Sequence, residues 1–490
     1  GAVPRRAGAQ GVAVAVADGQ EAGEADARRR LDKAIAAIAL PSFAQLCTEP
    51  LAGIVDTANV GHLSRAALGG MGVAVAAQYS LTKLFNDPLL RVTTSLVAAA
   101  PKEEKSESIA AVLVLAIVLG VTQVAWFGPG AGAAIQHMGV ATNAAMYAPA
   151  VSYLRIRALG APLGSLLLAL TGVCRGLGDA KWPLYASMVA TVVNVALDPL
   201  LIFTFGLGCG GAAAATVAAQ GCGALLLLVK LARLRRDGAL GGDAGGGGGL
   251  RWSVLVRVLR NFVATAGVMI ARNWGKVFCF TFMARQAALQ GATIAAAYGL
   301  VFQLGFATSQ VAEALATSTQ VLLAQALQAI KGAAGKFSFA PLPPRAAAKR
   351  VIQRGLQAGL LLSLVLSFGT FVAKDWMLAR MTSDGPVQAA AAAVMPVVLL
   401  CQVFKALAYP MNGCLMGALD WSFSAVVLWT AGATGVGVYS ALSALGLGQG
   451  GGVSALVAMW LGLTSFFGAQ LVLGLTRIAS CTGPWRALRD

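Results

Sequence analysis

The chain has 490 residues, of which 57% are hydrophobic and only 12% are charged. A soluble domain carries about a quarter charged residues, so this composition excludes an ordinary water-soluble enzyme or binding domain. The 37 Lys and Arg outnumber the 20 Asp and Glu, which gives a formal net charge of +17. We interpret this excess as basic loops beside membrane segments and predict no nucleic-acid partner.

Apolar runs of membrane-spanning length recur along the whole chain. One helical span needs about 20 apolar residues, and IAAVLVLAIVLGVTQVAWFG at 109–128 is a clear example. The sequence therefore predicts an all-α polytopic membrane protein with about twelve transmembrane helices. Their expected ranges are 34–60, 66–98, 109–128, 147–173, 182–206, 210–234, 254–283, 290–328, 351–373, 388–416, 422–445 and 452–475.

A basic, glycine-rich stretch at mid-chain divides the predicted helices into two groups of six. The N-terminal residues are rich in Ala and Gly and include Arg28–Arg30, which fits the remnant of an organellar transit peptide, although four acids weaken that interpretation. The expected organisation is a flexible N-terminal segment at 1–30, a first lobe at 31–235, a cytoplasmic linker at 236–250, a second lobe at 251–478 and a cytoplasmic tail at 479–490.

Basic residues are unevenly divided between the two sides of the membrane. The connections on one side contain most of them, whereas the other side has mainly Arg65, Arg285, Lys374 and Arg380. Because cytoplasmic loops are rich in Lys and Arg, both termini are predicted in the cytoplasm or the equivalent compartment. The plastid envelope, the vacuolar membrane and the plasma membrane all agree with this pattern.

The two halves share a short repeat. GVCRGLGD at 172–179 and GCLMGALD at 413–420 have the same G-x3-G-x2-D pattern, at the end of the fourth helix of each half. Glycines four residues apart allow helices to pack closely in lipid, so the simple interpretation is packing followed by a turn. Duplicated six-helix halves are also typical of transporters, whose substrate site lies between the halves. We therefore expect two lobes related by pseudo-two-fold symmetry.

Acidic residues lie inside two of the predicted spans. Asp56 is in the first span, and Asn194 and Asp198 are four residues apart on one face of the fifth. A charged residue inside a span costs at least about 2.5–3.5 kcal/mol and usually marks a functional site. Two acids and an amide at similar depth predict a cation or proton site. The alternative is that each acid caps a helix or pairs with an arginine.

The first span also contains Glu49 and Pro50. Proline removes a backbone hydrogen bond, so Pro50 is the expected hinge of this helix. Two carboxylates in one desolvated pocket cannot both ionise easily and therefore titrate as a unit. We expect cation occupancy at Asp56 and Asp198 to switch the helix between straight and bent forms. Glu49, seven residues before Asp56, shares its face and is a candidate for the substrate cavity.

A second set of intramembrane charges is positive. Snorkelling to the membrane surface accounts for Arg91 but less readily for the others. If several of them face a central cavity, they favour an anionic substrate such as a carboxylate, and Glu313 is the nearest acid in the second half. The remaining candidates for the cavity are Lys83, Arg272, Lys276, Gln303 and Lys405.

The sequence resembles a known transporter family over about residues 35–475. EPLAGIVDTANVGHLSRAALGGMGVA and KLFNDPLLRVTTSLVA resemble the first two helices of the multidrug and toxic compound extrusion (MATE) family. LRIRALGAPLGSLLLALTGVCRGLGDAKWPLYASMVATVVNVALDPLLIF is similar to its fourth and fifth helices. The match is closest to the DNA-damage-inducible F-like branch of plants and algae. It implies a V-shaped pair of six-helix lobes that expel substrates in exchange for protons or sodium.

The resemblance also implies a cation site. In this branch an Asp of helix 1, an Asn and an Asp of helix 5 and a Thr of helix 6 bind the coupling proton or sodium, and these positions match Asp56, Asn194, Asp198 and Thr216. Another branch uses a glutamate of helix 7, but residues 251–290 contain no Asp or Glu. The expected protein is a monomeric antiporter for small molecules that needs no cofactor besides its coupling ion.

Two other functions are alternatives to export. A membrane-embedded enzyme needs clustered metal ligands, a nucleophile with a base, or an acidic diphosphate-binding motif, and the sequence contains none of these. A flippase for a lipid-linked substrate, using the same cavity, is the remaining alternative.

Overall fold

The computed structural model describes residues 29, 32–33, 35–36, 43, 46, 48, 51–99, 104–177, 179, 181–238, 252–330, 343–446 and 452–489. Throughout these residues the regular secondary structure is helical. The predicted N-terminal segment, Glu49, the hinge Pro50 and most of the mid-chain linker lie outside the described residues.

The first half of the chain forms six helical rods, several of them interrupted. Residues 51–61 are the described end of the first rod. The others are α2 (Arg65–Leu81) with the π-helix η1 (Thr82–Asn86) and α3 (Asp87–Ala99), α4 (Lys105–His137), α5 (Tyr147–Leu159) with α6 (Ala161–Gly176), α7 (Lys181–Pro199) with the π-helix η2 (Leu200–Thr204), and α8 (Gly208–Arg236).

The second half forms six long, continuous rods and a short terminal helix. They are α9 (Trp252–Leu289), α10 (Ala292–Ile330), α11 (Pro344–Met381), α12 (Gly385–Gly417), α13 (Trp421–Ala444), α14 (Val453–Ala479) and the 3-10 helix η3 (Gly483–Leu488).

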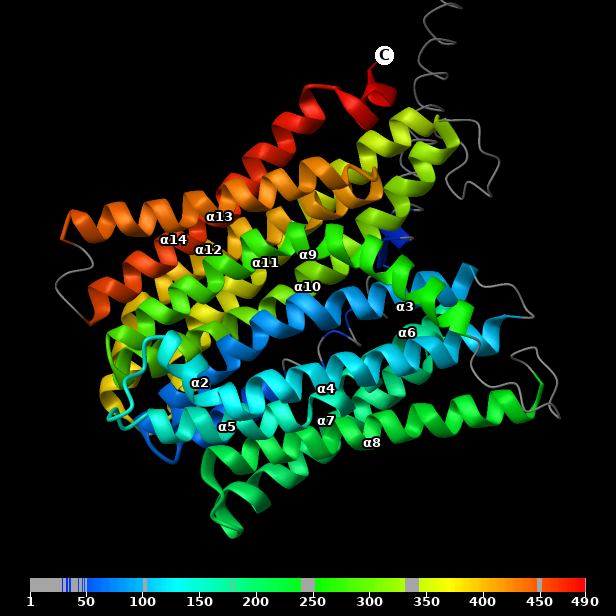
Figure 1. The fold of residues 1–490 in the computed structure, drawn as a ribbon. Coiled ribbons are helices and arrows are strands. Elements are labelled where there is room, and N and C mark those ends of the chain that lie inside the picture. The colour runs from blue at the N-terminus through cyan, green and yellow to red at the C-terminus, as the bar shows by residue number, and fades with distance from the viewer. Residues whose placement is uncertain are drawn as a thin grey trace, which may run out of the picture.

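These rods confirm the predicted two-lobed, twelve-helix layout, as far as the described residues go. The helices of the first half lie together in one group, and α9–α14 lie together in the other (Figure 1). Seven described helices are long and apolar enough to cross a membrane, and α5 with α6 forms an eighth span. The protein is therefore a multi-pass membrane protein.

The fourth span, expected over 147–173, is bent. The axes of α5 and α6 meet at 50° around Gly160. Pro162 in the first turn of α6 has no N–H to bond to the preceding turn, and its ring crowds that turn, so the helix breaks there. Gly160 is needed because a Cβ at this position would collide with Val217 of α8.

The shared G-x3-G pattern makes the same packing contact in both lobes. A Cβ on Gly172 or Gly176 of α6 would come within 2.9 Å of Leu90 O or 2.8 Å of Thr94 O on α3. Gly417 of α12 is equally tight against Gln320 O of α10, at 2.6 Å. The fourth helix of each half therefore packs closely on the second, as pseudo-two-fold lobes require.

Replacing Gly413 by alanine should destabilise the second lobe, because the added Cβ would collide with Ala316 O of α10. Overpacking of this kind costs about 1–3 kcal/mol. Gly369→Ala on α11 is the matched control, since a Cβ there meets nothing within 4 Å. Thermal unfolding in detergent should show a lower midpoint for Gly413→Ala only, and equal midpoints would contradict the close packing.

The two lobes meet at the end of the molecule that the charge pattern predicts to be outside. Arg65 at the start of α2 forms an ion pair with Asp384 before α12, with 2.8 Å between Nε and Oδ2. Thr382 Oγ1 donates to Gly61 O at 3.1 Å, and His62 Nε2 lies 3.1 Å from Arg380 O. We call these contacts between residues 61–65 and 380–384 the outer latch.

The C-terminal residues pack against the second lobe. Trp485 of η3 is fully buried, and its Nε1 donates to Asp420 Oδ2 at 3.2 Å. Arg477 at the end of α14 donates to the same carboxylate at 2.8 Å. The predicted tail thus adds to the core at this end, and Asp420 of the repeated motif is its anchor.

Candidate functional site

Two charged regions lie in the interior, one acidic and one basic. The acidic one, which we call the acid pocket, contains the four residues that the sequence singled out. Asp56 comes from the 51–61 helix, Asn194 and Asp198 are one turn apart on α7, and Thr216 is on α8. Asp56 is 6% exposed, Asn194 2% and Asp198 0%. Three segments far apart in the sequence therefore bring these polar groups together in one lobe.

The acid pocket is rich in acceptors and poor in donors. Thr216 Oγ1 lies 3.3 Å from Asp56 Oδ2, and the carboxyl groups of Asp56 and Asp198 are close enough to interact electrostatically. Asp56 Oδ1, both carboxylate oxygens of Asp198 and both polar side-chain atoms of Asn194 have no hydrogen-bond partner among the described residues. Two buried, facing carboxylates have no donor to share unless a proton or another cation comes between them.

The backbone of the fifth span is irregular next to these residues. Asp198 is followed by Pro199, and the helix continues as the π-helix η2. Proline cannot complete the regular i to i−4 hydrogen bond, which accounts for the local change in winding. Such π-segments occur frequently at functional sites. The break sits one residue from the carboxylate of Asp198.

Arg157 is a member of this region that the sequence analysis overlooked. Its Nε donates to Gln78 Oε1 at 2.9 Å, and its NH1 donates to Gln220 Oε1 at 3.3 Å. Gln220 is one helical turn beyond Thr216 on α8, and Thr216 contacts Asp56. Arg157 therefore lies beside the acid pocket. A charge inside the fourth span was the available signal, in the run YLRIRAL.

The second charged region is a cavity between the lobes, which we call the basic cavity. It encloses about 960 Å³, open solvent included. The first lobe contributes Asp87 and Arg91 from α3, and the second contributes Arg272 and Lys276 from α9 and Glu313 from α10. The structure therefore brings together two predicted cavity bases and the predicted acid. It also places Arg91, for which snorkelling to the membrane surface was a plausible alternative, on the wall of this cavity.

The bases of this cavity contact both charged and neutral groups. Arg91 NH2 lies 3.9 Å from Glu313 Oε1, across the gap between the lobes. Arg272 Nε donates to Ser424 Oγ at 2.7 Å, and its NH1 donates to Asn273 Oδ1 at 3.2 Å. Lys276 Nζ donates to Tyr409 OH at 3.4 Å. Three cations thus line the cavity with two carboxylates, Asp87 and Glu313, so the cavity wall is positive.

The other cavity candidates lie elsewhere. Gln303 of α10 lines a smaller space between the lobes together with Thr57 and Tyr79. Lys405 of α12 is 7% exposed and lies inside the second lobe, apart from the basic cavity. It approaches Lys276 only across a narrow, aromatic-lined space. Lys83 lies in η1, and its side chain is outside the described residues.

Two helical lobes in a membrane, with buried carboxylates in one lobe and a cavity between them, define a transporter built on repeated halves. The chain belongs to the MatE family. The family model matches residues 41–200. Protein DETOXIFICATION 44, chloroplastic, from Arabidopsis thaliana is 33% identical over 467 residues, covering 93% of this chain and 83% of the relative. The membership of this chain in the family confirms the prediction and shows that the protein is a transporter, not an enzyme.

Further similarities support the family and the fold. The DNA damage-inducible protein F of Escherichia coli is 32% identical over 224 residues, covering 43% of this chain and 47% of that protein. A solved structure, the inward-facing conformation of a multidrug resistance MATE family transporter, superposes with a TM-score of 0.73 at 16% identity. That match covers 89% of this chain and 95% of the other, and it shows the fold alone.

Proposed function

We propose that the protein is a secondary antiporter that exports organic anions in exchange for protons or sodium. The observation that carries the proposal is the separation of charge: an acid pocket buried in the first lobe, and a basic cavity between the lobes. A cation and an anion then have different sites in one molecule. Alternating access of the cavity to the two sides couples their movements.

The acid pocket is the proposed site of the coupling ion. Asp56 and Asp198 supply the charge, and Asn194 and Thr216 supply neutral oxygens. Sodium accepts carboxylate, amide and hydroxyl oxygens, and a proton needs only the two facing carboxylates, so the donor set fits either ion. We propose that occupancy of this pocket changes the shape of the first helix around Pro50 and thereby favours release of the substrate.

The basic cavity is the proposed site of the exported anion. Arg91, Arg272 and Lys276 outnumber the two carboxylates of the cavity wall, Asp87 and Glu313, and a substrate carboxylate supplies the missing negative charge. A cavity that selects cationic drugs would need the opposite balance. A lipid-linked flippase is the second candidate, because the same cavity has apolar walls around Phe466 and Phe467.

We propose that the protein works in the plastid envelope, since the Arabidopsis relative is named as chloroplastic. We also propose that it works as a monomer.

Export from proteoliposomes tests the function. The liposomes are loaded with labelled citrate or with a cationic dye, and a pH gradient or a sodium gradient is imposed separately. We expect one of the two gradients to drive citrate out, while the dye leaves slowly. Faster export of the dye than of citrate would instead indicate a transporter for cationic drugs. Citrate retained under both gradients, together with transbilayer movement of a fluorescent lipid, would favour the flippase.

Changing Arg272 and Lys276 together to glutamine should reduce citrate export strongly and dye export little. The substitutions remove two positive charges from the wall of the basic cavity but keep a polar side chain that can donate hydrogen bonds. Arg260→Gln on the same helix is the matched control, because Arg260 is exposed and lies outside the cavity. Initial export rates give the comparison. A larger loss for the dye than for citrate would contradict the anion assignment.

A further inference from the structure

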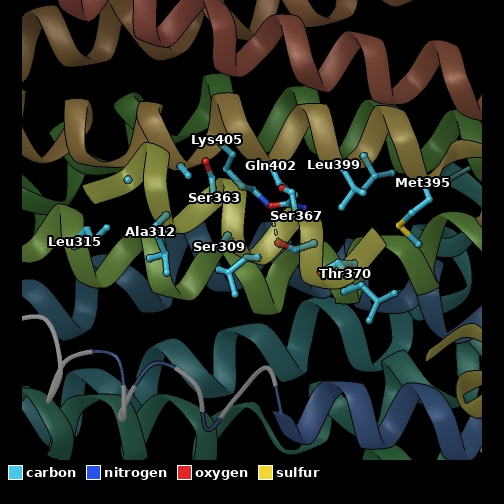
Figure 2. Close-up of a pocket in the computed structure, with 17 residues that line it drawn as sticks. Ser309, Ala312, Leu315, Ser363, Ser367, Thr370, Met395, Leu399, Gln402 and Lys405 are labelled. Carbon is cyan, nitrogen blue, oxygen red and sulfur yellow. Dashed lines mark hydrogen bonds between the residues drawn. The ribbon is translucent and has the colours of Figure 1, made fainter. Parts of the chain in front are cut away.

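A separate pocket lies inside the second lobe, between α10, α11 and α12. It encloses about 500 Å³, open solvent included, and its wall is mostly apolar. In Figure 2 the polar side chains Ser309, Ser363, Ser367, Gln402 and Lys405 lie near the middle of the pocket. Leu315 and Ala312 extend to one side of them, and Leu399 and Met395 to the other. We call it the Lys405 pocket.

Lys405 is a buried cation held by neutral oxygens. Its Nζ donates to Gly305 O at 2.9 Å and to Gln402 Oε1 at 3.4 Å, and it lies 5.7 Å from the ring centre of Phe467. No described carboxylate forms an ion pair with it. An ammonium has three N–H donors, so one remains beyond the two hydrogen bonds. A buried charge normally has a counter-charge, and the described chain supplies none.

A second polar group in the pocket also lacks a partner. Ser367 Oγ is buried and has no hydrogen bond among the described residues, whereas Ser363 Oγ donates to Leu360 O at 2.8 Å. A carboxylate beside Lys405 would accept from both Lys405 and a hydroxyl such as Ser367. The polar groups thus match the head of a carboxylic acid, and the apolar ends match a hydrocarbon body.

The corresponding place in the first lobe is filled. There, Gln123 Nε2 donates to Asn86 Oδ1 at 3.1 Å and to Ser165 Oγ at 3.3 Å, while Ser165 Oγ donates to Asn86 Oδ1 at 3.2 Å. This buried cluster joins η1, α4 and α6, which are parts of the second, third and fourth rods. Its members are therefore hydrogen-bonded to one another.

Two alanines open the equivalent place in the second lobe. In the register that pairs Gly172 with Gly413, Ser165 corresponds to Ala406. The glycines 172 and 413 contact Leu90 O and Ala316 O, respectively. In the register that pairs these two carbonyls, Asn86 corresponds to Ala312. Both alanines line the Lys405 pocket. The position of the polar cluster in the first lobe therefore corresponds to the Lys405 pocket in the second lobe.

We propose that the Lys405 pocket binds a monocarboxylic acid with an apolar chain. Its carboxylate contacts Lys405 and Ser367, and its chain lies along Leu399 and Met395. Such a pocket, apolar with a few convergent polar groups, is the usual form of a small-molecule site. Binding here does not depend on export, so it stands apart from the proposed function.

Octanoate binding to the purified protein tests the proposal. Thermal unfolding in a neutral detergent is followed with octanoate, with octanol and with sodium chloride. We expect octanoate to raise the unfolding midpoint of the wild type, and octanol and chloride to leave it unchanged. Lys405→Met should weaken octanoate binding by about tenfold or more. Lys374→Met, which removes a half-buried lysine of α11 that pairs with Asp375 outside the pocket, should bind as the wild type does.

A pocket-filling variant tests the site without removing the lysine. Ala312→Asn with Ala406→Ser introduces the residues of the first lobe and should abolish stabilisation by octanoate. It also provides a test if Lys405→Met does not fold. Equal stabilisation by octanol or by chloride would overturn the proposal. So would octanoate binding that survives both the lysine substitution and the filled pocket.

Discussion

Replacing Asp198 by asparagine is expected to abolish gradient-driven export while leaving folding and membrane insertion intact. Asp198 is fully buried, and neither of its carboxylate oxygens has a hydrogen-bond partner among the described residues. Asparagine has nearly the same shape but does not ionise, so the acid pocket keeps its packing and loses one of two charges. Export from proteoliposomes should fall to the level of protein-free liposomes.

Asp56→Asn should give the same loss, because the two carboxylates act as one pair. Asp179→Asn is a control on the same lobe, since that aspartate accepts from Lys181 N and Trp182 N at the start of α7, outside the acid pocket. It should retain coupled export. Wild-type coupling in both Asp198→Asn and Asp56→Asn would refute the cation-site assignment.

Replacing Gly61 by leucine is the second change with a large expected effect, because it should hold the outer end of the lobes open. A Cβ at Gly61 would collide with Met381 O, so the outer latch has no room for a side chain. The ion pair of Arg65 with Asp384 and the hydrogen bond of Thr382 to Gly61 O should then be lost. A transporter that cannot close one end cannot complete alternating access, and export should stop.

Cysteine labelling reports the opening. Leu68 of α2 is 1% exposed and lines the space between the lobes, so Leu68→Cys should react faster with a membrane-impermeant maleimide when Gly61 is leucine. The chain without the added cysteine gives the background. Gly130→Leu is the control, because a Cβ there meets nothing within 4 Å. Full transport by Gly61→Leu, or unchanged labelling, would show that the latch does not close the outer end.

The features visible in the sequence are those that do not depend on contacts between lobes. Hydropathy predicts the spans because lipid requires about 20 apolar residues per helix. Asn194 and Asp198 are conspicuous because charge is costly inside a span, and their spacing of four puts them on one face. The glycines at 172 and 413 are visible as a repeat. These features account for the fold and for the acid pocket.

Other features depend on distances that one sequence does not contain. Arg65 and Asp384 are 319 residues apart, and no pattern in either segment predicts their pairing. The sequence leaves open whether Arg91 snorkels to the membrane surface, and only the structure places it in the cavity beside Glu313. Ala312 and Ala406 carry no signal in the sequence, and they line a pocket only because of the way α10 and α12 pack. The bend at Gly160 likewise depends on packing. Pro162 breaks the helix, and Val217 leaves no room for a Cβ at Gly160.

The most direct measurement of the central claim follows both ions in one vesicle. Proteoliposomes carry labelled citrate and a pH-sensitive dye inside, and the uptake of labelled sodium is recorded during citrate export. We predict that either protons or sodium enter in fixed proportion to the citrate that leaves, and that neither enters in Asp198→Asn. Citrate that leaves the wild-type vesicles without entry of either cation would contradict the account, and so would unchanged cation entry in Asp198→Asn.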